Sequence, residues 1–386
     1  MKRGMNSGDI KRANRGLFLK NIALGKANSR IELSKLTGLT KMTAGNITQE
    51  LLQLGIIEET GPIYAGVTGP APQKLTISKS APKIVGVYIS RDEIVFSIGT
   101  LTGDIIQKSA TPLFKETVKT ISAKLVEGIK SAIEHQEDNI LAIGVAMIGP
   151  IDIDGAITDS PNFFGIKKLP VKNIINSNFN YPTVICNDIS ASAIAEHLKG
   201  GEVHSNFVFI GNSNGLGAGI IHGGELLTSN NLFIGEFGHI TIDANGEKCP
   251  CGNTGCLELY ASHMVLLKRL SDAVGKKVCS KDFEELAKNP ECDKIFKDIS
   301  EKLSAGLLTI TNLLRPEAFI IGYDGYYLPD KYLNIIEQNI NNVRFLKEGE
   351  KIKVYKAHHR SESAIYGSIA TVLNEVFSGR ILFNNR

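Results

Sequence analysis

The sequence lacks the long apolar segments that a membrane helix or a secretory signal requires. Its longest uncharged apolar run, about 140–151, is shorter than the roughly 20 residues that cross a bilayer, and it contains glycine and proline. The opening residues, MKRGMNSGDIKRANRG, contain no apolar core of a signal peptide. We therefore expect a cytoplasmic protein with no membrane partner.

Cysteine is also scarce, since only 6 of the 386 residues are cysteines, and 8 are histidines. One histidine and three cysteines nevertheless gather in the stretch 239–256, with the spacing H-x9-C-x-C-x4-C. In a reducing cytoplasm, closely spaced cysteines favour a metal site over disulfides. Four such ligands would fill a tetrahedral Zn²⁺ and leave no position for water, so the predicted metal is structural. The predicted ligands are His239, Cys249, Cys251 and Cys256.

A redox pair of cysteines is the main alternative for this stretch. Cys249 and Cys251 form a C-x-C pair, whereas redox motifs have the spacing C-x-x-C, and a histidine lies close by. A second alternative is four unrelated residues in a surface loop, which the spacing disfavours. Cys186, Cys279 and Cys292 have no such neighbours in the sequence and are interpreted as ordinary thiols.

A net charge of +3 conceals a strongly basic N-terminal region. Residues 1–50 contain ten Lys and Arg against three acids, a balance of +7, so the remaining residues together carry −4. This asymmetry suggests a small nucleic-acid-binding module joined to a larger body, and the length of 386 residues also favours several domains. The alternative is a basic helix that is only exposed to solvent.

Three helical patterns follow one another near the N-terminus. The first occupies 15–25 and ends on a glycine that suits the position after a helix. The second occupies 31–38, and Ser29 and Glu32 have the spacing of a capping box at its start. The third occupies 41–54 and has its apolar residues on one stripe. The order of the helices is that of a helix-turn-helix unit.

The third helix has a polar face at its beginning, after Thr40 as a cap. Short polar side chains at such a helix start can reach base edges in the major groove, and the positive end of the helix can lie near phosphate. The predicted DNA contacts on this helix and beside it are Arg30, Thr40, Lys41, Thr43, Gly45, Asn46 and Gln49.

Two strand-like runs around a Gly/Pro-rich loop follow at 56–78 and complete the order of a winged helix-turn-helix. A plain three-helix packing module is the alternative. The basic charge, the capped short second helix and the hairpin together favour DNA binding. We assign residues 1–80 to this domain.

From residue 81 onward, strands and helices alternate, which predicts an α/β body at 81–386. About 300 residues suggest two lobes, one of about 83–190 plus the C-terminal helix and one of about 191–365. Expected strands lie at 84–90, 94–100, 103–110, 140–149, 183–188, 207–212, 217–223, 239–243 and 318–322, and expected helices at 115–135 and 191–200.

Three polar features of the body suggest ligand contacts. Asn187 and Asp188 end a predicted strand, where open α/β sheets bind ligands, and Asp188 can act as a base or accept a hydroxyl hydrogen bond. The alternative is that Asp188 only caps the following helix. The glycine-rich turn 211–220 either approaches phosphate or forms a tight hairpin. Asn162 either binds a polar ligand or belongs to an ordinary turn.

With these residues in view, the chain resembles the ROK family, named for repressors, open reading frames and sugar kinases, over essentially its whole length. The most specific element is the run 235–259, GEFGHITIDANGEKCPCGNTGCLEL, which is similar to the family's zinc-binding signature. The resemblance implies a two-lobed, actin-like ATPase fold of the sugar-kinase type with a sugar between the lobes. It also implies that His239 gives one ring nitrogen to zinc and the other to the sugar. The implied sugar contacts are Asn162, Asn187, Asp188, Glu236, His239 and Glu258.

The chain departs from the family's kinase pattern where ATP would bind. The family's first phosphate motif reads DxGGT, and the matching stretch here has Tyr88 for the acid, Arg91 for a glycine and Asp92 for the threonine, with Ser90 between them. Acidic side chains near a triphosphate add repulsion where donors are needed.

The second nucleotide motif departs as well. The family's adenosine motif is glycine-rich, whereas Tyr323 and Asp324 follow the strand here and would crowd a purine. The second phosphate loop keeps Gly215, Gly217 and Gly219. Asp188, which is the catalytic base in family kinases, is also present. Retained sugar residues with altered nucleotide residues favour sensing over catalysis.

The N-terminal module also favours a regulator over a kinase. The family's repressors of the xylose and N-acetylglucosamine operon type carry such a module, and its kinases usually lack it. Such repressors often have a basic, arginine-containing wing tip, whereas this wing reads Gly69-PAPQ-Lys74. Lys74 and Gln73 are its candidates for a DNA contact, and Lys74 is the predicted one.

We expect a sugar-responsive transcriptional repressor that binds operator DNA as a homodimer or tetramer. Its effector would be a monosaccharide or a sugar phosphate, and its cofactor structural Zn²⁺. An active sugar kinase with an added DNA-binding domain is the main alternative. A DNA-binding protein with a vestigial sugar cleft is another.

Overall fold

The computed structural model describes residues 6–62, 72–134, 139–160, 162–199, 204–228, 234–343 and 350–383. The chain divides into two compact units, a first unit of Met1–Asp188 with Ser368–Arg386 and a second unit of Ile189–Gly367. No helix in these described ranges is long and apolar enough to span a bilayer. The predicted wing tip at 69–71 lies outside the described residues.

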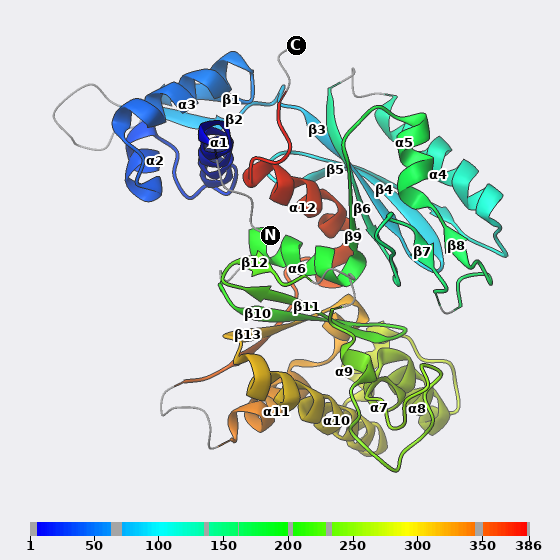
Figure 1. Ribbon diagram of the computed structural model, residues 1–386. Helices are drawn as coiled ribbons and strands as arrows, with labels where there is room; N and C mark the ends of the chain where they lie inside the picture. Colours follow the sequence, from blue (N-terminus) through cyan, green and yellow to red (C-terminus); the bar gives the residue numbers. More distant parts are fainter. Residues whose placement is uncertain are drawn as a thin grey trace. The chain divides into compact units, whose positions relative to one another are not determined.

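The N-terminal part of the first unit, called the head below, contains the three predicted helices and the hairpin (Figure 1). Asn6 and Asp9 form a capping box, so the first helix begins eight residues before the predicted start at residue 15. The strands pair antiparallel, with Ile57 opposite Ile77. The elements are α1 (Ser7–Ala23), α2 (Arg30–Thr37), α3 (Lys41–Gln53), β1 (Ile57–Pro62) and β2 (Gln73–Ile77).

Ion pairs join α1 to α3 at the side of the head. Arg15 Nη1 lies 2.8 Å and Lys11 Nζ 3.1 Å from the carboxylate oxygens of Glu50. Burial acts to raise the pKa of Glu50, but the hydrogen bonds and charges of Lys11 and Arg15 outweigh it and lower that pKa. Phe18, Leu19 and Leu51 are fully buried, so an apolar core and the ion pairs of Glu50 together hold α3 against α1.

A five-stranded mixed sheet forms the centre of the first unit. The central strand pairs antiparallel with the strand that follows it and parallel with a later one. The strands across the sheet are β5 (Ile105–Pro112), β4 (Glu93–Gly99), β3 (Lys83–Ile89), β6 (Ile140–Met147) and β9 (Thr183–Asn187). The helices α4 (Val118–Ile133) and α5 (Val171–Asn178) cover one face, and β7 (Ile157–Thr158) pairs with β8 (Lys168–Leu169) beside it (Figure 1).

Glycines line the opposite face, where α12 (Ser363–Phe377) packs. A Cβ on Gly144 would clash with the backbone carbonyl of Ser368, and a Cβ on Gly86 would lie within 2.7 Å of Ile369. Successive side chains of a strand point to opposite faces of the sheet. The glycines therefore share one face, while their neighbours in the chain, such as Val145, face the α4 core on the other. The helix backbone therefore lies directly on the sheet.

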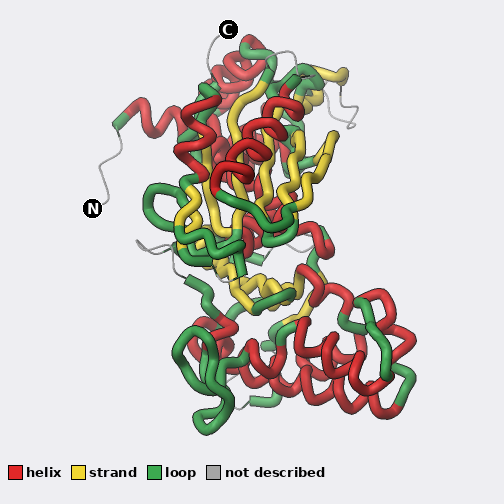
Figure 2. The backbone as a smooth tube through the Cα atoms, turned by 90° about the vertical axis from the view of Figure 1, so that its right-hand side faces the viewer, coloured by secondary structure: helices red, strands yellow, loops and turns green. Residues whose placement is uncertain are grey.

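The second unit contains a second five-stranded sheet with the same order of strands. Its strands are β12 (Glu225–Leu226), β11 (Leu216–His222), β10 (Phe207–Asn212), β13 (Ala318–Gly322) and β14 (Lys353–Lys356). A layer of helices packs against one face of this sheet (Figure 2). These helices are α7 (Glu258–Ala261), α8 (His263–Val274), α9 (Phe283–Leu286), α10 (Pro290–Leu314) and α11 (Asp330–Asn341).

The helix α6 (Asp188–Lys199) covers the other face of the second sheet. It also rests on glycines, because a Cβ on Gly219 would lie 2.7 Å from the side chain of Ala193 and from the carbonyl of Ile189. The glycine-rich turn 211–220 therefore forms a tight hairpin between β10 and β11, and its glycines form the surface on which α6 packs. The two sheets have the same strand order, and each has a helix, α12 or α6, packed on its glycines. The two units are therefore structural repeats.

Most predicted elements are confirmed, and one strand is wrong. The sequence predicts a strand at 239–243, but His239 is the last residue of a short 3-10 helix, Phe237–His239. The residues after it form one isolated bridge, Thr241 to Cys256. Its alternating apolar residues pack instead as part of a loop, since Ile240 and Ile242 contact the α8–α10 core.

The close packing of α12 on the glycines of the first sheet leads to a prediction. Replacing Gly144 by alanine should destabilise the protein by about 1–3 kcal/mol, because the new methyl group meets a helix backbone that cannot move aside. The measurement is the urea midpoint of unfolding. Gly45→Ala is the control, since Gly45 lies in α3 with open space around it, and alanine should keep or slightly raise stability there. Equal midpoints for Gly144→Ala and wild type would refute this packing.

Candidate functional site

One candidate site is the loop after Phe237–His239, where the predicted metal ligands come together. The ligand atoms of His239, Cys249, Cys251 and Cys256 all lie within 4.8 Å of one another. Sγ of Cys249 is 3.7 Å from Nδ1 of His239, and Sγ of Cys251 is 3.7 Å from Sγ of Cys256. These four residues form a cluster that can hold a metal ion, called the metal cluster below.

Glycine and asparagine shape the backbone around the metal cluster. Gly255 has a φ of 66°, and a Cβ there would clash with the carbonyl of Asp243, so only glycine fits. The side-chain amide of Asn253 donates to the carbonyl of His239 at 3.2 Å and lies 3.4 Å from Sγ of Cys256. The ligands are thus positioned by the loop itself.

The thiols of the metal cluster have unequal pKa values. Burial raises the pKa of Cys249 to about 12 and raises that of Cys256, whereas the backbone N–H of Asn253 lowers the pKa of Cys251. A bound cation favours the thiolate form of each ligand, which burial alone disfavours.

Two carboxylates flank His239 within the second unit. Oε1 of Glu258 is 3.3 Å from Nδ1 of His239, and Oε2 of Glu236 is 3.9 Å from Nε2. The side chain of Glu236 is 63% exposed and that of Glu258 only 23%. Gly215, in the β10–β11 turn, borders the same place, because its Cβ would lie 3.4 Å from Oε2 of Glu258. The structure thus groups three of the six predicted sugar residues beside the metal cluster.

The other three predicted sugar residues belong to the first unit. Asn187 ends β9, and Asp188, which is only 7% exposed, is the first residue of α6. The amide of Asn187 donates to Oδ1 of Asp188 at 3.1 Å, and Gly149 lies beside that amide. Asn162 is exposed and has a φ of 58°, in a loop where Asp159 also has a positive φ. Non-glycine residues in this conformation are uncommon and gather at ligand-binding loops.

The turn after β3, at the place of the first phosphate motif, is closed by its own side chain. The hydroxyl of Ser90 accepts the backbone N–H groups of Asp92 at 3.2 Å and Glu93 at 3.0 Å. The same hydroxyl donates to the carbonyl of Glu93 at 3.0 Å. Tyr88 is the next-to-last residue of β3, and Arg91 lies within the turn.

The turn after β13, at the place of the adenosine motif, is occupied by a tyrosine. Tyr323 has a φ of 56°, its ring lies 6.1 Å from that of Phe209, and its hydroxyl accepts from Ser192 at 3.4 Å. The ring also lies 3.3 Å from where a Cβ of Gly211 would be. Asp324 accepts a hydrogen bond from the hydroxyl of Ser213.

The exposed face of α3 is a third feature. The hydroxyl of Thr40 accepts the N–H of Thr43 at 3.1 Å, so Thr40 caps the helix as predicted. Thr43 and Gly45 are half-buried. Arg30 donates to Glu59 at 2.8 Å while remaining 48% exposed, and Lys74 is exposed on β2. The exposed residues of α3 are Lys41, Met42, Asn46, Gln49 and Gln53.

Met42 and Gln53 were not among the predicted DNA contacts, although they share the exposed face. Met42 is 77% exposed. The spacing 42, 46, 49, 53 follows one stripe of an α-helix, and this periodicity could have identified both residues. Met42 was missed because an apolar residue near a helix start is usually assigned to the core.

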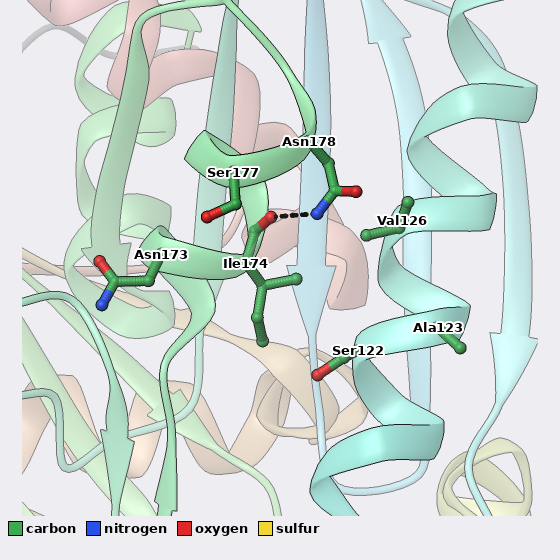
Figure 3. Close-up of a pocket in the computed structure, with 7 residues that line it drawn as sticks. All are labelled: Ser122, Ala123, Val126, Asn173, Ile174, Ser177 and Asn178. Atoms are coloured by element: carbon green, nitrogen blue, oxygen red, sulfur yellow. Dashed lines mark hydrogen bonds between the residues drawn. The ribbon is translucent and has the colours of Figure 1, made fainter.

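A hollow of about 540 Å³ lies between α4 and α5 in the first unit (Figure 3). Its polar rim is partly engaged, since the amide of Asn178 donates to the carbonyl of Ile174 at 2.8 Å (Figure 3). None of the predicted DNA, sugar or metal residues lines it. The lining residues are Ser122, Ala123, Val126, Asn173, Ile174, Ser177 and Asn178.

A winged head followed by two repeated sheets defines a protein with a DNA-binding type of head and an actin-like, sugar-kinase type of body. The chain belongs to the ROK family, whose model matches residues 84–375. This match confirms the resemblance drawn from the sequence.

Three similar curated proteins are named as repressors. The chain is 28% identical to the putative xylose repressor of Caldicellulosiruptor sp. (strain Rt8B.4), over 96% of this chain and 97% of the relative. It is 32% identical to the xylose repressor of Bacillus spizizenii, over 81% of this chain and 82% of the relative. It is 25% identical to the DNA-binding transcriptional repressor Mlc of Escherichia coli, over 97% of this chain and 96% of the relative.

Two kinds of solved structure share the fold. A ROK family transcriptional regulator, homologous to E. coli Mlc, superposes with a TM-score of 0.82 at 24% identity, over 97% of this chain and 98% of the other. The ROK hexokinase of Thermus thermophilus superposes with a TM-score of 0.64 at 25% identity, over 75% of this chain and 97% of the other. The predicted fold class is therefore confirmed.

The metal cluster generates a prediction. Purified full-length protein should contain about one metal ion per chain, and Cys256→Ser should lose most of it, because the cluster then keeps three strong ligands instead of four. Elemental analysis of dialysed protein measures the content. Cys279→Ser is the matched control, since Cys279 is an exposed cysteine outside the cluster. Full metal content in Cys256→Ser would show that Cys256 is not a ligand.

Proposed function

We propose that this chain is a sugar-responsive, DNA-binding transcriptional repressor. The proposal is carried by one combination: a winged helix-turn-helix head on a sugar-kinase-like body whose ATP-side turns are closed by their own side chains. In this proposal residues 1–80 bind DNA and 81–386 bind the sugar. The body's two lobes are about 83–190 with the C-terminal helix and about 191–365.

The β3–β4 turn argues against phosphoryl transfer. A phosphate-binding turn needs backbone N–H groups that are free to face the ligand, together with an acid that positions the metal ion. Here the hydroxyl of Ser90 already accepts the N–H groups of Asp92 and Glu93, at 3.2 and 3.0 Å. The carboxylates of Asp92 and Glu93 would also repel a triphosphate.

The β13 turn argues in the same direction. An adenine site needs an open surface beside the glycines of β10 and β13, whereas the ring of Tyr323 packs on Phe209 and over Gly211. The hydroxyl of Tyr323 is held by Ser192. We infer that the protein does not phosphorylate its sugar, and that Asp188 serves as a hydrogen-bond acceptor rather than as a catalytic base.

The sugar contacts proposed are Asn162, Asn187, Asp188, Glu236, His239 and Glu258. Carboxylates and amides suit this work, because each can accept or donate paired hydrogen bonds to neighbouring hydroxyls. The relatives named as xylose and N-acetylglucosamine repressors support a monosaccharide or a sugar phosphate as the effector.

We propose zinc as the metal, held by His239, Cys249, Cys251 and Cys256. In a tetrahedron with bonds of about 2.3 Å the ligand atoms are about 3.7 Å apart. The Cys249–His239 and Cys251–Cys256 separations of 3.7 Å fit that geometry, and one nitrogen with three sulfurs is a set that zinc prefers. Four protein ligands leave no place for water, so bound zinc would hold the loop that carries His239 rather than catalyse a reaction.

Operator binding is assigned to α3 and its surroundings. The proposed contacts are Arg30, Thr40, Lys41, Thr43, Gly45, Asn46, Gln49 and Lys74. A dimer or tetramer would place two heads on a palindromic or repeated operator, as two-fold symmetry requires. A repressor acts where the chromosome is, so we place the protein in the cytoplasm.

The helix α12 offers a route from the body to the head. Its residues Ser363–Gly367 belong to the second unit and Ser368–Phe377 to the first. At its end, a Cβ on Gly16 of α1 would clash with the carbonyl of Phe377. A sugar that binds one body conformation better by about 1–3 kcal/mol could thus shift operator affinity through this helix.

The sugar site generates a prediction. Xylose, glucose, N-acetylglucosamine or glucose 6-phosphate should raise the melting temperature, and the stabilising sugar should change operator affinity. Asp188→Asn should lower the affinity for that sugar by about 10- to 100-fold, because a hydrogen bond to a charged acceptor contributes roughly 1.5–3 kcal/mol. Asp154→Asn, an exposed acid outside the site, is the matched control.

The same sugar incubated with ATP and Mg²⁺ tests the kinase alternative. We expect no sugar phosphate and no ADP release above the background of Asp188→Asn. Turnover that Asp188→Asn abolishes would replace the repressor by a kinase with an added DNA-binding domain. Operator binding that no sugar alters would instead leave a repressor with a vestigial sugar site.

The head generates a separate prediction. Lys41→Ala should weaken binding to all duplexes alike and reduce the salt slope of log affinity by about one, as expected for one lost phosphate contact. Fluorescence anisotropy at several salt concentrations measures the slope. Lys297→Ala, which removes an exposed lysine of α10 in the second unit, should leave the slope unchanged. An unchanged slope in Lys41→Ala would place the phosphate contact elsewhere.

A further inference from the structure

The exposed stripe of α3 has an unusual chemistry for a surface that reads DNA. Met42, Asn46, Gln49 and Gln53 are all exposed and lie opposite the buried stripe of Ala44, Ile47 and Leu51. None of the four is charged. The stripe therefore consists of one apolar side chain and three side-chain amides.

Two of the charged neighbours of this stripe are paired within the head, and the third, Lys41, is assigned to phosphate. Glu50, the acid of α3, is held by Arg15 and Lys11 at 2.8 and 3.1 Å, so it is not available to accept from a cytosine. Arg30 is hydrogen-bonded to Glu59 at 2.8 Å. The helix α3 itself contains no arginine. Arginine or lysine paired with guanine is the commonest specific contact in the major groove, and none of the four stripe residues can make it.

The polar side chains that remain match one kind of base pair. Asparagine and glutamine can bond both N6 and N7 of adenine, and an apolar side chain can contact the methyl group of thymine. Thr43 is a weaker reader, because its hydroxyl lies 2.9 Å from that of Thr40 in the cap. Gly45 leaves open space beside the stripe, which permits close approach of the helix to the groove.

We propose that α3 reads A·T base pairs in the major groove, with Asn46 and Gln49 on adenines and Met42 against a thymine methyl group. This inference rests on the proposed DNA-binding function and specifies its partner. The operator half-site read by the head is then an A·T core rather than one centred on guanines.

The test begins with selection of bound duplexes from a random pool by the full-length protein. We expect A·T pairs at the positions most sensitive to substitution. Replacing a core adenine by 7-deazaadenine, which removes N7, or a core thymine by uracil, which removes the methyl group, should weaken wild-type binding. Exchanging a core A·T pair for G·C should cost roughly ten- to a hundredfold in affinity.

Protein variants then assign the contacts. Asn46→Ala should bind less tightly and lose sensitivity to 7-deazaadenine at one position, and Met42→Ala should lose sensitivity to uracil at another. Lys41→Ala is the control that weakens every duplex alike and keeps both sensitivities. Circular dichroism checks that the variants are folded, and the modified duplexes test wild type independently of any variant.

Three outcomes would overturn the assignment or its basis. A selected core of G·C pairs, with specific binding intact, overturns the A·T reading but keeps the repressor proposal. A selected A·T core that tolerates both base modifications shows that the sequence is read elsewhere, such as by the wing in the minor groove. Absence of binding to any duplex by folded protein overturns the DNA-binding function itself.

Discussion

The close crossing of α6 and α12 is the constraint on which the rest of the body depends. A Cβ on Gly367 of α12 would lie 2.7 Å from the backbone carbon of Ala191 in α6, so the two helices touch backbone to backbone. The division between the two units falls at the first residue of α6 and just after Gly367. Each helix also rests on the glycines of one sheet. Small residues at these points let each helix lie directly on its own sheet.

The same constraint explains why the end of α12 matters for the head. Gly16 in α1 meets the carbonyl of Phe377, and a Cβ on Gly379 would lie 2.5 Å from the carbonyl of Arg12. The head therefore does not only follow the body along the chain but also contacts the end of a helix that belongs to both units. A ligand that biases the body can act on the head only through elements with two arrangements. In this account α12 is that element.

Local patterns in the sequence predicted much of the fold and part of the site. Ser29 and Thr40 marked two helix starts, alternation marked the strands, and the spacing of one histidine and three cysteines predicted the metal cluster. Long-range contacts were not visible in those patterns. Ile240 and Ile242 alternate as in a strand, yet they pack on helices beside the metal cluster. Likewise, no local pattern shows that Gly16 faces Phe377, or that Ser90 closes its own turn.

We propose that the binding of a sugar to the body and the binding of DNA to the head are linked within one molecule. Linkage requires that each ligand change the affinity of the other by the same factor. Titration calorimetry of the stabilising sugar into the full-length protein, alone and saturated with operator, measures this directly. We predict a change in sugar affinity of about 5- to 150-fold, equal to the change that the sugar causes in operator affinity. An identical sugar affinity in both states would contradict the account.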